Sequence, residues 1–385
     1  MDSVVVSKPG VFLGKTSERL VVRGPKPRLE LVDGGPQLLL PFEIPPPQRL
    51  TVLTSAGERT EPARLRGATP KPRTQPEQVE LPLFRVSEII VTGAGVTLST
   101  DLIQACCERG IRLAFLSSAG RPIAMVSSPM LTATVITRRA QMAAYTDDRG
   151  LTVAQAVVRG KLGNQAALLK YFGKYQKGTN PDAFARLSAA VKGIEKLRRE
   201  VDGVEGASID DARPSLLALE GSAGRHYWAG IRALLEAKTP FAVREHRGAT
   251  DPVNAALNYG YGILYTQVWG AIMNAGLEPF AGFLHVDRPG KPSLVLDLIE
   301  EFRQPIVDRA VVSLVTKGTS LEMRGGLLTD DGRHAVAASV IERLEGEVGF
   351  RGRRHRIKSV IQIQARNLAT SLRDRTAYRA FAFKW

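Results

Sequence analysis

One histidine and four acidic residues fall within residues 282–303, whose sequence is GFLHVDRPGKPSLVLDLIEEFR. A helix that is capped by Ser293 and ends before Pro305 would gather its apolar residues on one face, at about 100° per residue. The acidic residues on the other face would be Asp297, Glu300 and Glu301. An acidic outer face is typical of any amphipathic helix, so this pattern alone favours a solvated surface over half of a metal site.

Glu220 lies in a second stretch that could carry chemistry, SLLALEGSAGRHYW. Its helical neighbours are small or apolar, so the carboxylate is expected to project from an apolar face. A buried carboxylate is unfavourable unless it is protonated, paired or bound to a cation. Two interpretations stay open: a salt bridge to an arginine, or one ion shared with His285 and Glu300. Two carboxylates and an imidazole would suit Mn²⁺ or Mg²⁺ acting on phosphates.

Other common catalytic patterns are excluded. The segment GVFLGKT (10–16) has one residue too few between its glycines for a phosphate-binding loop, and a strand-like run follows it where a helix is required. The five histidines include no pair at helical metal-binding spacing, and no Ser-His-Asp arrangement has the spacing of a nucleophile elbow. Cys106 and Cys107 are adjacent, which gives neither a disulfide framework nor zinc-ligand spacing and favours a reducing, cytoplasmic setting.

The chain is strongly basic. Its 53 Lys and Arg exceed its 38 Asp and Glu, giving a net charge of +15 over 385 residues, which favours a polyanionic partner. Residues 351–385 hold 10 Lys or Arg against one acid, although a solvated surface would explain such a run equally well. Residues 252–277 carry no charge, but their Asn, Gln and Gly residues favour a buried helix over a membrane span. No signal peptide is indicated, so we expect no membrane association.

The pattern of elements changes along the chain. Short β-branched runs bounded by Gly, Pro and Ser predict strands up to about residue 126, with one short helix at 103–109. Residues 24–79 are rich in proline and indicate an insertion. From residue 138 onward the apolar period is helical. We therefore predict an α+β multidomain protein: a β domain at 1–127, a linker at 128–136 and a larger all-α catalytic domain at 137–385.

Several separate stretches, taken together and in order, resemble the CRISPR-associated endonuclease and integrase of the adaptation module, the family that inserts new spacers into CRISPR arrays. They are ELPLFRVSEIIVTGAGVTLSTDLIQACCERGIRLAFLSSAGRP, RRAQ, VVRGKLGNQ, LLALEGSAGRHYW, DPVNAALNYGYGILY, GFLHVDRPGKPSLVLDLIEEFRQPIVDR and IQARNLATSL. They cover most of residues 1–23 and 80–385. The resemblance implies an N-terminal β-sandwich-like domain followed by a helical domain, which agrees with the pattern of elements.

The resemblance also implies a site and partners. Its metal ligands would be Glu220, His285 and Glu300, with Asp297 as a further acid in the same site and Glu301 left as a solvated charge. DNA contacts are expected from Asn254, Lys291, Arg288, Arg138 and Lys161. With Mg²⁺ or Mn²⁺, a DNA 3′-hydroxyl would attack a phosphodiester of the CRISPR repeat, or water would attack in the nuclease reaction. The expected partners are a prespacer duplex, a second copy in a homodimer and a dimer of a small ferredoxin-like companion protein.

Two alternatives and one departure remain. A transposon-borne integrase of the same family would act without the companion; such proteins typically carry an additional C-terminal DNA-binding module, and this chain ends soon after QARNLAT. A catalytically silent DNA-binding scaffold would lack the acids and histidine that are present here. Residues 24–79 replace what is usually a short connection in the family, and we expect them to add a contact to a partner or to DNA.

Overall fold

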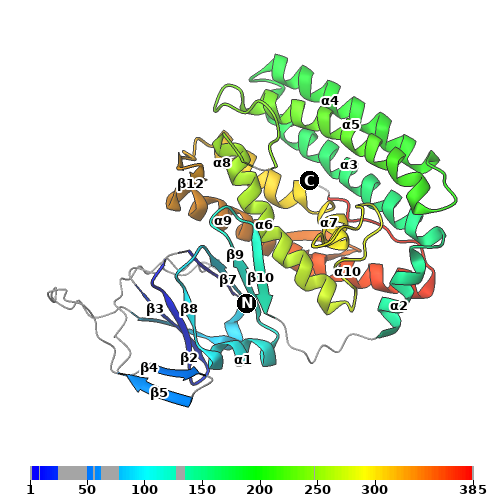
Figure 1. Ribbon diagram of the computed structural model, residues 1–385. Coiled ribbons are helices and arrows are strands. Elements are labelled where there is room, and N and C mark those ends of the chain that lie inside the picture. The colour runs from blue at the N-terminus through cyan, green and yellow to red at the C-terminus, as the bar shows by residue number, and fades with distance from the viewer. Residues whose placement is uncertain are drawn as a thin grey trace. The chain divides into compact units, whose positions relative to one another are not determined.

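A computed structural model describes residues 2–7, 9–24, 50–54, 57–61, 78–126, 135–246 and 248–383. The chain divides into two compact units, Met1–Leu113 and Ala114–Trp385, each described here by itself (Figure 1). Most of the proline-rich insertion lies outside the described residues, as do residues 128–134 of the expected linker. Within the insertion, β4 (Leu50–Thr54) and β5 (Gly57–Glu61) form an antiparallel hairpin.

Strands dominate the first part of the chain, as predicted. They are β1 (Asp2–Val6), β2 (Phe12–Thr16), β3 (Arg19–Arg23), β6 (Gln78–Pro82), β7 (Val86–Thr92), β8 (Thr97–Leu98), β9 (Arg112–Leu116) and β10 (Pro122–Val126), with a short 3₁₀ turn at Leu83–Arg85. One sheet has the order β1-β7-β9-β10 and the other β6-β3-β2-β8. The β-branched runs of β1, β3 and β7 are buried at consecutive residues, so both faces of these strands are covered. Residues Phe12–Thr16 of the segment GVFLGKT form β2, so this segment is a strand rather than a phosphate-binding loop.

The predicted short helix is α1 (Thr100–Arg109), which begins three residues earlier than expected. The Ser99 side chain accepts a hydrogen bond from the Leu102 amide at 3.3 Å, so Ser99 is the N-cap that starts the helix. Gly110 ends it in the left-handed conformation, with φ 66°.

Helices make up most of the second unit. They are α2 (Val135–Ala144), α3 (Asp148–Gln176), α4 (Pro181–Glu200), α5 (Ile209–Leu235), α6 (Pro252–Asn274), α7 (Ser293–Ile299), α8 (Arg309–Thr316), α9 (Asp330–Glu345) and α10 (Ile357–Asp374). A 3₁₀ turn at Val201–Gly203 and a π-helical turn at Arg303–Asp308 join some of them. Helices α3, α4 and α5, drawn in shades of green, lie side by side (Figure 1).

Two short hairpins correct the prediction that this part is all-α. They pair β11 (Met323–Arg324) with β12 (Leu327–Leu328), and β13 (Glu347–Phe350) with β14 (Arg353–Arg356). Their strands are too short to produce a clear period-2 pattern between helices, which is why sequence periodicity did not indicate them.

Helix α6 confirms the reading of the uncharged stretch as a buried helix. Most of its side chains are buried, including Asn254 and Gln267. Within the ranges described above, none of the helices combines the length and the hydropathy that a membrane crossing requires.

Candidate active site

Helix α7 and the loop before it position the residues of the opening stretch. The apolar face was predicted correctly: Leu294, Val295, Leu298, Ile299 and Phe302 are all buried. The cap was not, because Ser293 is the first helical residue and makes no capping bond. Its hydroxyl instead accepts a hydrogen bond from the Gly282 amide at 2.8 Å and contacts the Phe280 carbonyl oxygen at 2.6 Å. Ser293 therefore fastens the preceding loop to the start of α7.

Asp297 holds the histidine. Its buried carboxylate accepts backbone hydrogen bonds from Phe283, Leu284 and His285 at 2.6, 3.0 and 2.9 Å. It also lies 2.8 Å from His285 Nδ1. Nδ1 is the ring nitrogen that faces the carboxylate, so a neutral His285 that donates to Asp297 from Nδ1 has its lone pair on Nε2. Asp297 thus acts from behind His285 and presents Nε2 as a potential ligand.

Replacing Asp297 with asparagine should release this orientation. An asparagine keeps the size of the side chain but puts an N–H group where only acceptors are needed. We expect the affinity of the site for Mn²⁺ to fall by about 10- to 100-fold, as is usual when a residue that orients a ligand is lost. The melting temperature should fall too, so Mn²⁺ binding should be measured below the variant's melting range. Unchanged affinity in a folded variant would contradict this role.

Glu220, Lys161 and Glu300 meet at one point although they come from α5, α3 and the end of α7. The Lys161 ammonium group forms an ion pair with Glu220 and lies 2.6 Å from Glu300 Oε2. The side chains of Lys161 and Glu300 are 10% and 4% exposed, whereas that of Glu220 is 25% exposed. Glu220 therefore forms a salt bridge, which was one of the two interpretations of its sequence. Its partner is a lysine rather than an arginine, and its side chain lies at the edge of the interior rather than deep inside it.

The charges of this cluster stabilise one another. Burial raises the pKa of Glu300, but Arg303, Lys161 and His285 outweigh it and bring the pKa to about 2. Burial lowers the pKa of Lys161, but Glu300 and Glu220 outweigh it, so this pKa lies above its ordinary value. Both groups are therefore ionised at neutral pH, and the carboxylates are already arranged around a cation.

The donor types fit Mg²⁺ or Mn²⁺, which prefer carboxylate oxygens and accept imidazole nitrogen. The arrangement itself holds an ammonium group instead. Among the residues that the structure describes, no three His, Cys, Asp or Glu side chains are close enough together to hold a metal ion. Binding of a divalent ion by Glu220, His285 and Glu300 therefore requires Lys161 to give way between the two carboxylates.

The expected DNA contacts fall into two groups. Arg288 and Lys291 lie in an exposed turn closed by a 2.9 Å bond from the Lys291 amide to the Arg288 carbonyl, and the Arg138 side chain is 43% exposed. Lys161 and Asn254 are buried. The Asn254 side chain donates a hydrogen bond from Nδ2 to the Val243 carbonyl oxygen at 2.7 Å. Its Oδ1 accepts one from the Glu245 backbone N–H at 2.8 Å, so Asn254 shapes the loop before α6. In this arrangement neither buried side chain is exposed to a DNA surface.

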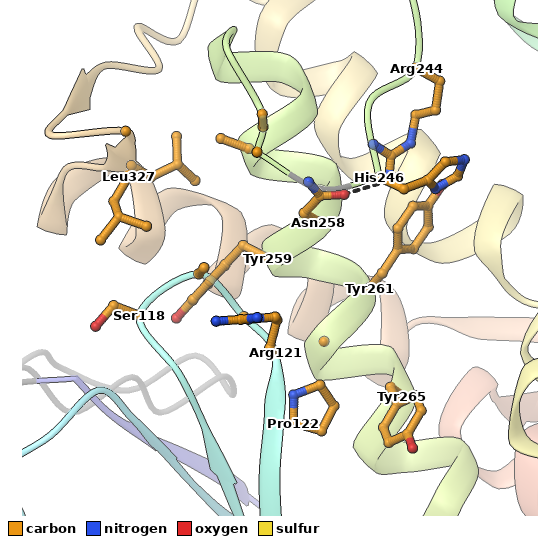
Figure 2. A pocket seen from close by; sticks show the side chains of 18 of the residues that line it. Ser118, Arg121, Pro122, Arg244, His246, Asn258, Tyr259, Tyr261, Tyr265 and Leu327 are labelled. Carbon is orange, nitrogen blue, oxygen red and sulfur yellow. Dashed lines mark hydrogen bonds between the residues drawn. The ribbon is translucent and has the colours of Figure 1, made fainter. Parts of the chain in front are cut away.

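A cavity of about 430 Å³ opens beside the cluster, and a second of about 490 Å³ adjoins it. Glu220 and Lys161 line the first, while Arg121 lines the second. The two cavities share four lining residues: Arg244, His246, Tyr261 and Arg303. Figure 2 shows Arg244, His246 and Tyr261 gathered beside α6.

Two arginines in the shared wall were not identified from the sequence. The Arg303 guanidinium lies 4.8 Å from the centre of the Tyr261 ring, and that of Arg244 lies 5.4 Å from it. Arg303 Nη1 is also 3.4 Å from Glu300 Oε1. Its position three residues after Glu300, one turn along a helix, was a signal that could have identified it. Arg244 lies in a loop and offered none. Together they make the wall next to the carboxylates strongly cationic.

Asp308 supports this wall from inside. Its carboxylate accepts a hydrogen bond from the Tyr227 hydroxyl at 2.6 Å and a second from the Tyr261 hydroxyl. Burial raises the pKa of Asp308, although both tyrosines and the nearby Arg303 and Arg244 oppose the shift. Asp308 therefore fixes the Tyr261 ring, against which both arginines lie.

Glu301 is a correction. It was expected to be a solvated charge, but it is fully buried. Its carboxylate accepts hydrogen bonds from the Tyr378 hydroxyl at 2.6 Å, the Phe381 amide at 2.7 Å and Gln364 Nε2 at 2.9 Å. Glu301 thus joins α7 to α10 and to the segment that follows it. Periodicity could not show this, because the partners lie more than 60 residues further along the chain.

The burial of Glu301 predicts a pH effect. Burial raises its pKa to about 7, although the three hydrogen bonds oppose the shift. A carboxyl whose pKa is raised on folding binds more protons in the folded state, so its contribution to stability falls as pH rises from about 4.5 to 7. We expect Glu301→Gln to remove up to about 3 kcal/mol of this pH dependence. Unfolding of the wild type and the variant by urea across this pH range gives the free energy of unfolding of each at every pH. If the two free energies change with pH in parallel, the prediction is contradicted.

Comparison with known proteins places these features in context. A family model described as "CRISPR associated protein Cas1" matches residues 63–342. A relative from Archaeoglobus fulgidus, "CRISPR-associated endonuclease Cas1 1", is 37% identical over 312 residues, which cover 78% of this chain and 90% of the relative. Another, from Francisella tularensis subsp. novicida, is 32% identical over 305 residues, covering 79% and 90%.

Solved structures share the fold. A casposase bound to its integration product aligns over 99% of this chain and 93% of its own, with a TM-score of 0.72 and 21% identity. A chain of a "Cas6-RT-Cas1--Cas2 complex" aligns over 99% of this chain and 36% of its own, with a TM-score of 0.67 and 17% identity.

Proposed function

Because the chain belongs to the Cas1 family, as its sequence motifs indicated, we propose that it is a metal-dependent DNA endonuclease and integrase. It would insert spacers from foreign DNA into a CRISPR array, as part of prokaryotic adaptive immunity. The observation that carries this proposal is the convergence of Glu220 and Glu300 on one cation, beside a histidine that Asp297 orients.

Glu220, His285 and Glu300 would hold Mg²⁺ or Mn²⁺. When bound, the ion would polarise the target phosphodiester and stabilise the oxygen that leaves. Asp297 keeps the proton on His285 Nδ1, so Nε2 stays available without any rearrangement of the ring. No covalent bond to the protein is required, because a DNA 3′-hydroxyl, or water in the nuclease reaction, attacks the phosphorus directly.

Arg303 and Arg244 would bind the substrate's phosphates. Both guanidinium groups line the cavity that contains Glu220, and both are held against the Tyr261 ring. Guanidinium groups match phosphate geometry and stay charged at any physiological pH. They would therefore balance the negative charge of DNA next to the acidic residues Glu220 and Glu300, which would otherwise repel it.

The proposal includes partners and setting. We infer a prespacer duplex and the CRISPR repeat as substrates, a homodimer, a dimer of a small ferredoxin-like companion, and a cytoplasmic location. The solved complex that contains Cas1 and Cas2 supports the companion, since this chain shares its fold. The casposase shares the fold as well, but relatives above 30% identity are named CRISPR-associated endonucleases, which favours the CRISPR role over a transposon-borne integrase.

Strand transfer into a plasmid that carries a CRISPR repeat tests the proposal. The wild-type protein and its companion should join labelled prespacer ends to the repeat in Mn²⁺, and EDTA should stop the reaction. Protein that binds the prespacer but joins no ends with any divalent ion would be the silent scaffold instead. Integration that needs no companion would indicate the transposon-type reaction.

A further inference from the structure

The β13–β14 hairpin places an arginine where the backbone disfavours one. Phe350 pairs with Arg353, so the turn between the strands has two residues, Arg351 and Gly352. Both have positive φ, 49° and 80°, as in a type I′ turn. Asn or Gly is usual at the first of these positions, and another residue costs roughly 1 kcal/mol there. Backbone conformation does not favour arginine at the tip, which indicates that its side chain has a role there.

The charges of the hairpin are only partly balanced. Arg354 Nε lies 2.9 Å from Glu347, and Arg356 Nη1 lies 2.8 Å from Glu345. These two acids thereby serve the lower part of the hairpin. Arg351 and Arg353 are both exposed, and neither forms an ion pair with any residue that the structure describes. The tip therefore presents two unbalanced guanidinium groups.

Aromatic packing makes the hairpin a firm support. The Phe350 ring lies 5.8 Å from that of Phe381, which stacks on Phe302 at 5.3 Å. Phe302 directly follows Glu300 and Glu301. The Arg351 guanidinium lies 5.5 Å from the Phe350 ring centre, which restricts the arginine as well. The tip is thus connected through packed rings to the segment that carries the candidate active site.

We propose that Arg351 and Arg353 form a phosphate-binding tip that holds duplex DNA outside the candidate active site. Guanidinium groups bind phosphates in a bidentate manner, and Arg351, which lies against the Phe350 ring, loses less entropy on binding than a free side chain would. A two-stranded ribbon is also narrow enough to lie along a groove of the duplex. The proposal rests on the proposed function in requiring a DNA substrate, and it assigns part of the basic C-terminal run to DNA rather than to solvent.

The salt dependence of DNA binding tests the tip. Each phosphate contact contributes about −0.9 to the slope of log K against log salt, so losing two contacts should make the slope shallower by about 2. The double variant Arg351→Gly, Arg353→Gln removes both charges, and glycine relieves the strained φ at residue 351, so the fold should be retained. The control is Lys192→Gln, Lys196→Gln, which removes two exposed charges from α4.

Binding is measured with a DNA duplex of about 30 base pairs. We expect the slope of the tip variant to become shallower by about two units and that of the control by less than about half a unit. Equal losses would overturn the proposal, since they would reflect net charge alone. An unchanged slope in the tip variant would also overturn it, as would loss of companion binding in its place. None of these results would contradict the proposed function, because the wild-type protein would still bind DNA and integrate it. If the wild-type protein bound no DNA, the proposed function itself would be contradicted.

Discussion

Replacing Glu300 with glutamine should lower Mn²⁺-dependent strand transfer by at least about 100-fold, because even residues that only orient metal ligands cost 10- to 100-fold when lost. Glutamine keeps the size of the side chain but removes the charge that Lys161 and Arg303 stabilise. Glu220→Ala and His285→Ala should abolish the reaction in the same way. Transfer of labelled prespacer ends into a repeat-bearing plasmid measures the effect.

The control is Glu342→Gln, the same chemical change at an exposed position of α9, which should leave strand transfer intact. Each variant should also be melted by circular dichroism and shown to keep the oligomeric state of the wild type, since loss of fold would imitate loss of a ligand. Wild-type integration by a folded Glu220, His285 or Glu300 variant would show that the ligands have been assigned wrongly.

Replacing Lys161 with methionine should have two opposite effects. Without metal, Glu220 and Glu300 lose the cation between them, and removing one partner of a buried ion pair typically costs about 3–5 kcal/mol. With Mn²⁺, the variant should bind the ion more tightly than the wild type, because no ammonium group has to be displaced. Calorimetric titration with MnCl₂ and melting with and without Mn²⁺ measure both effects.

Lys170→Met is the matched control. Lys170 lies on the same helix and pairs with Glu195 at 2.8 Å, but its side chain is 55% exposed, and exposed pairs contribute only about 0–1 kcal/mol. Its affinity for Mn²⁺ should equal that of the wild type. If Lys161→Met gains neither Mn²⁺ affinity nor a larger Mn²⁺-induced rise in melting temperature than Lys170→Met, Lys161 does not occupy the position of the metal.

Local sequence predicted the parts of this fold that depend on local rules. The change from strands to helices, the buried helix α6 and the apolar face of α7 all follow from the period of apolar residues and the length of each run. The short hairpins β11–β12 and β13–β14 escaped because runs of two to four residues have no measurable period.

The site was only partly predictable for a different reason. Glu300 and Glu301 are adjacent and chemically identical, and both looked like outer-face charges. The structure buries both, but α3 and α5 bring a lysine and a second carboxylate to Glu300, whereas α10 and the segment after it supply the partners of Glu301. Contacts between residues so far apart leave no trace in local spacing. Resemblance to a family separated the two acids, but physical patterning did not.

The contacts of Glu301 have a consequence for synthesis of the protein. Asn164 of α3 donates hydrogen bonds to the Glu301 carbonyl at 2.8 Å and to the Phe381 carbonyl at 2.9 Å, and accepts one from the Phe383 amide at 2.8 Å. Residues 378–383 follow every other element of the site in the chain, so they are the last of these to leave the ribosome. A nascent chain that lacks them leaves Glu301 with one of its three hydrogen-bond partners, Gln364. The hydrogen bonds around the segment that carries Glu300 are thus completed only after residues 378–383 have been translated.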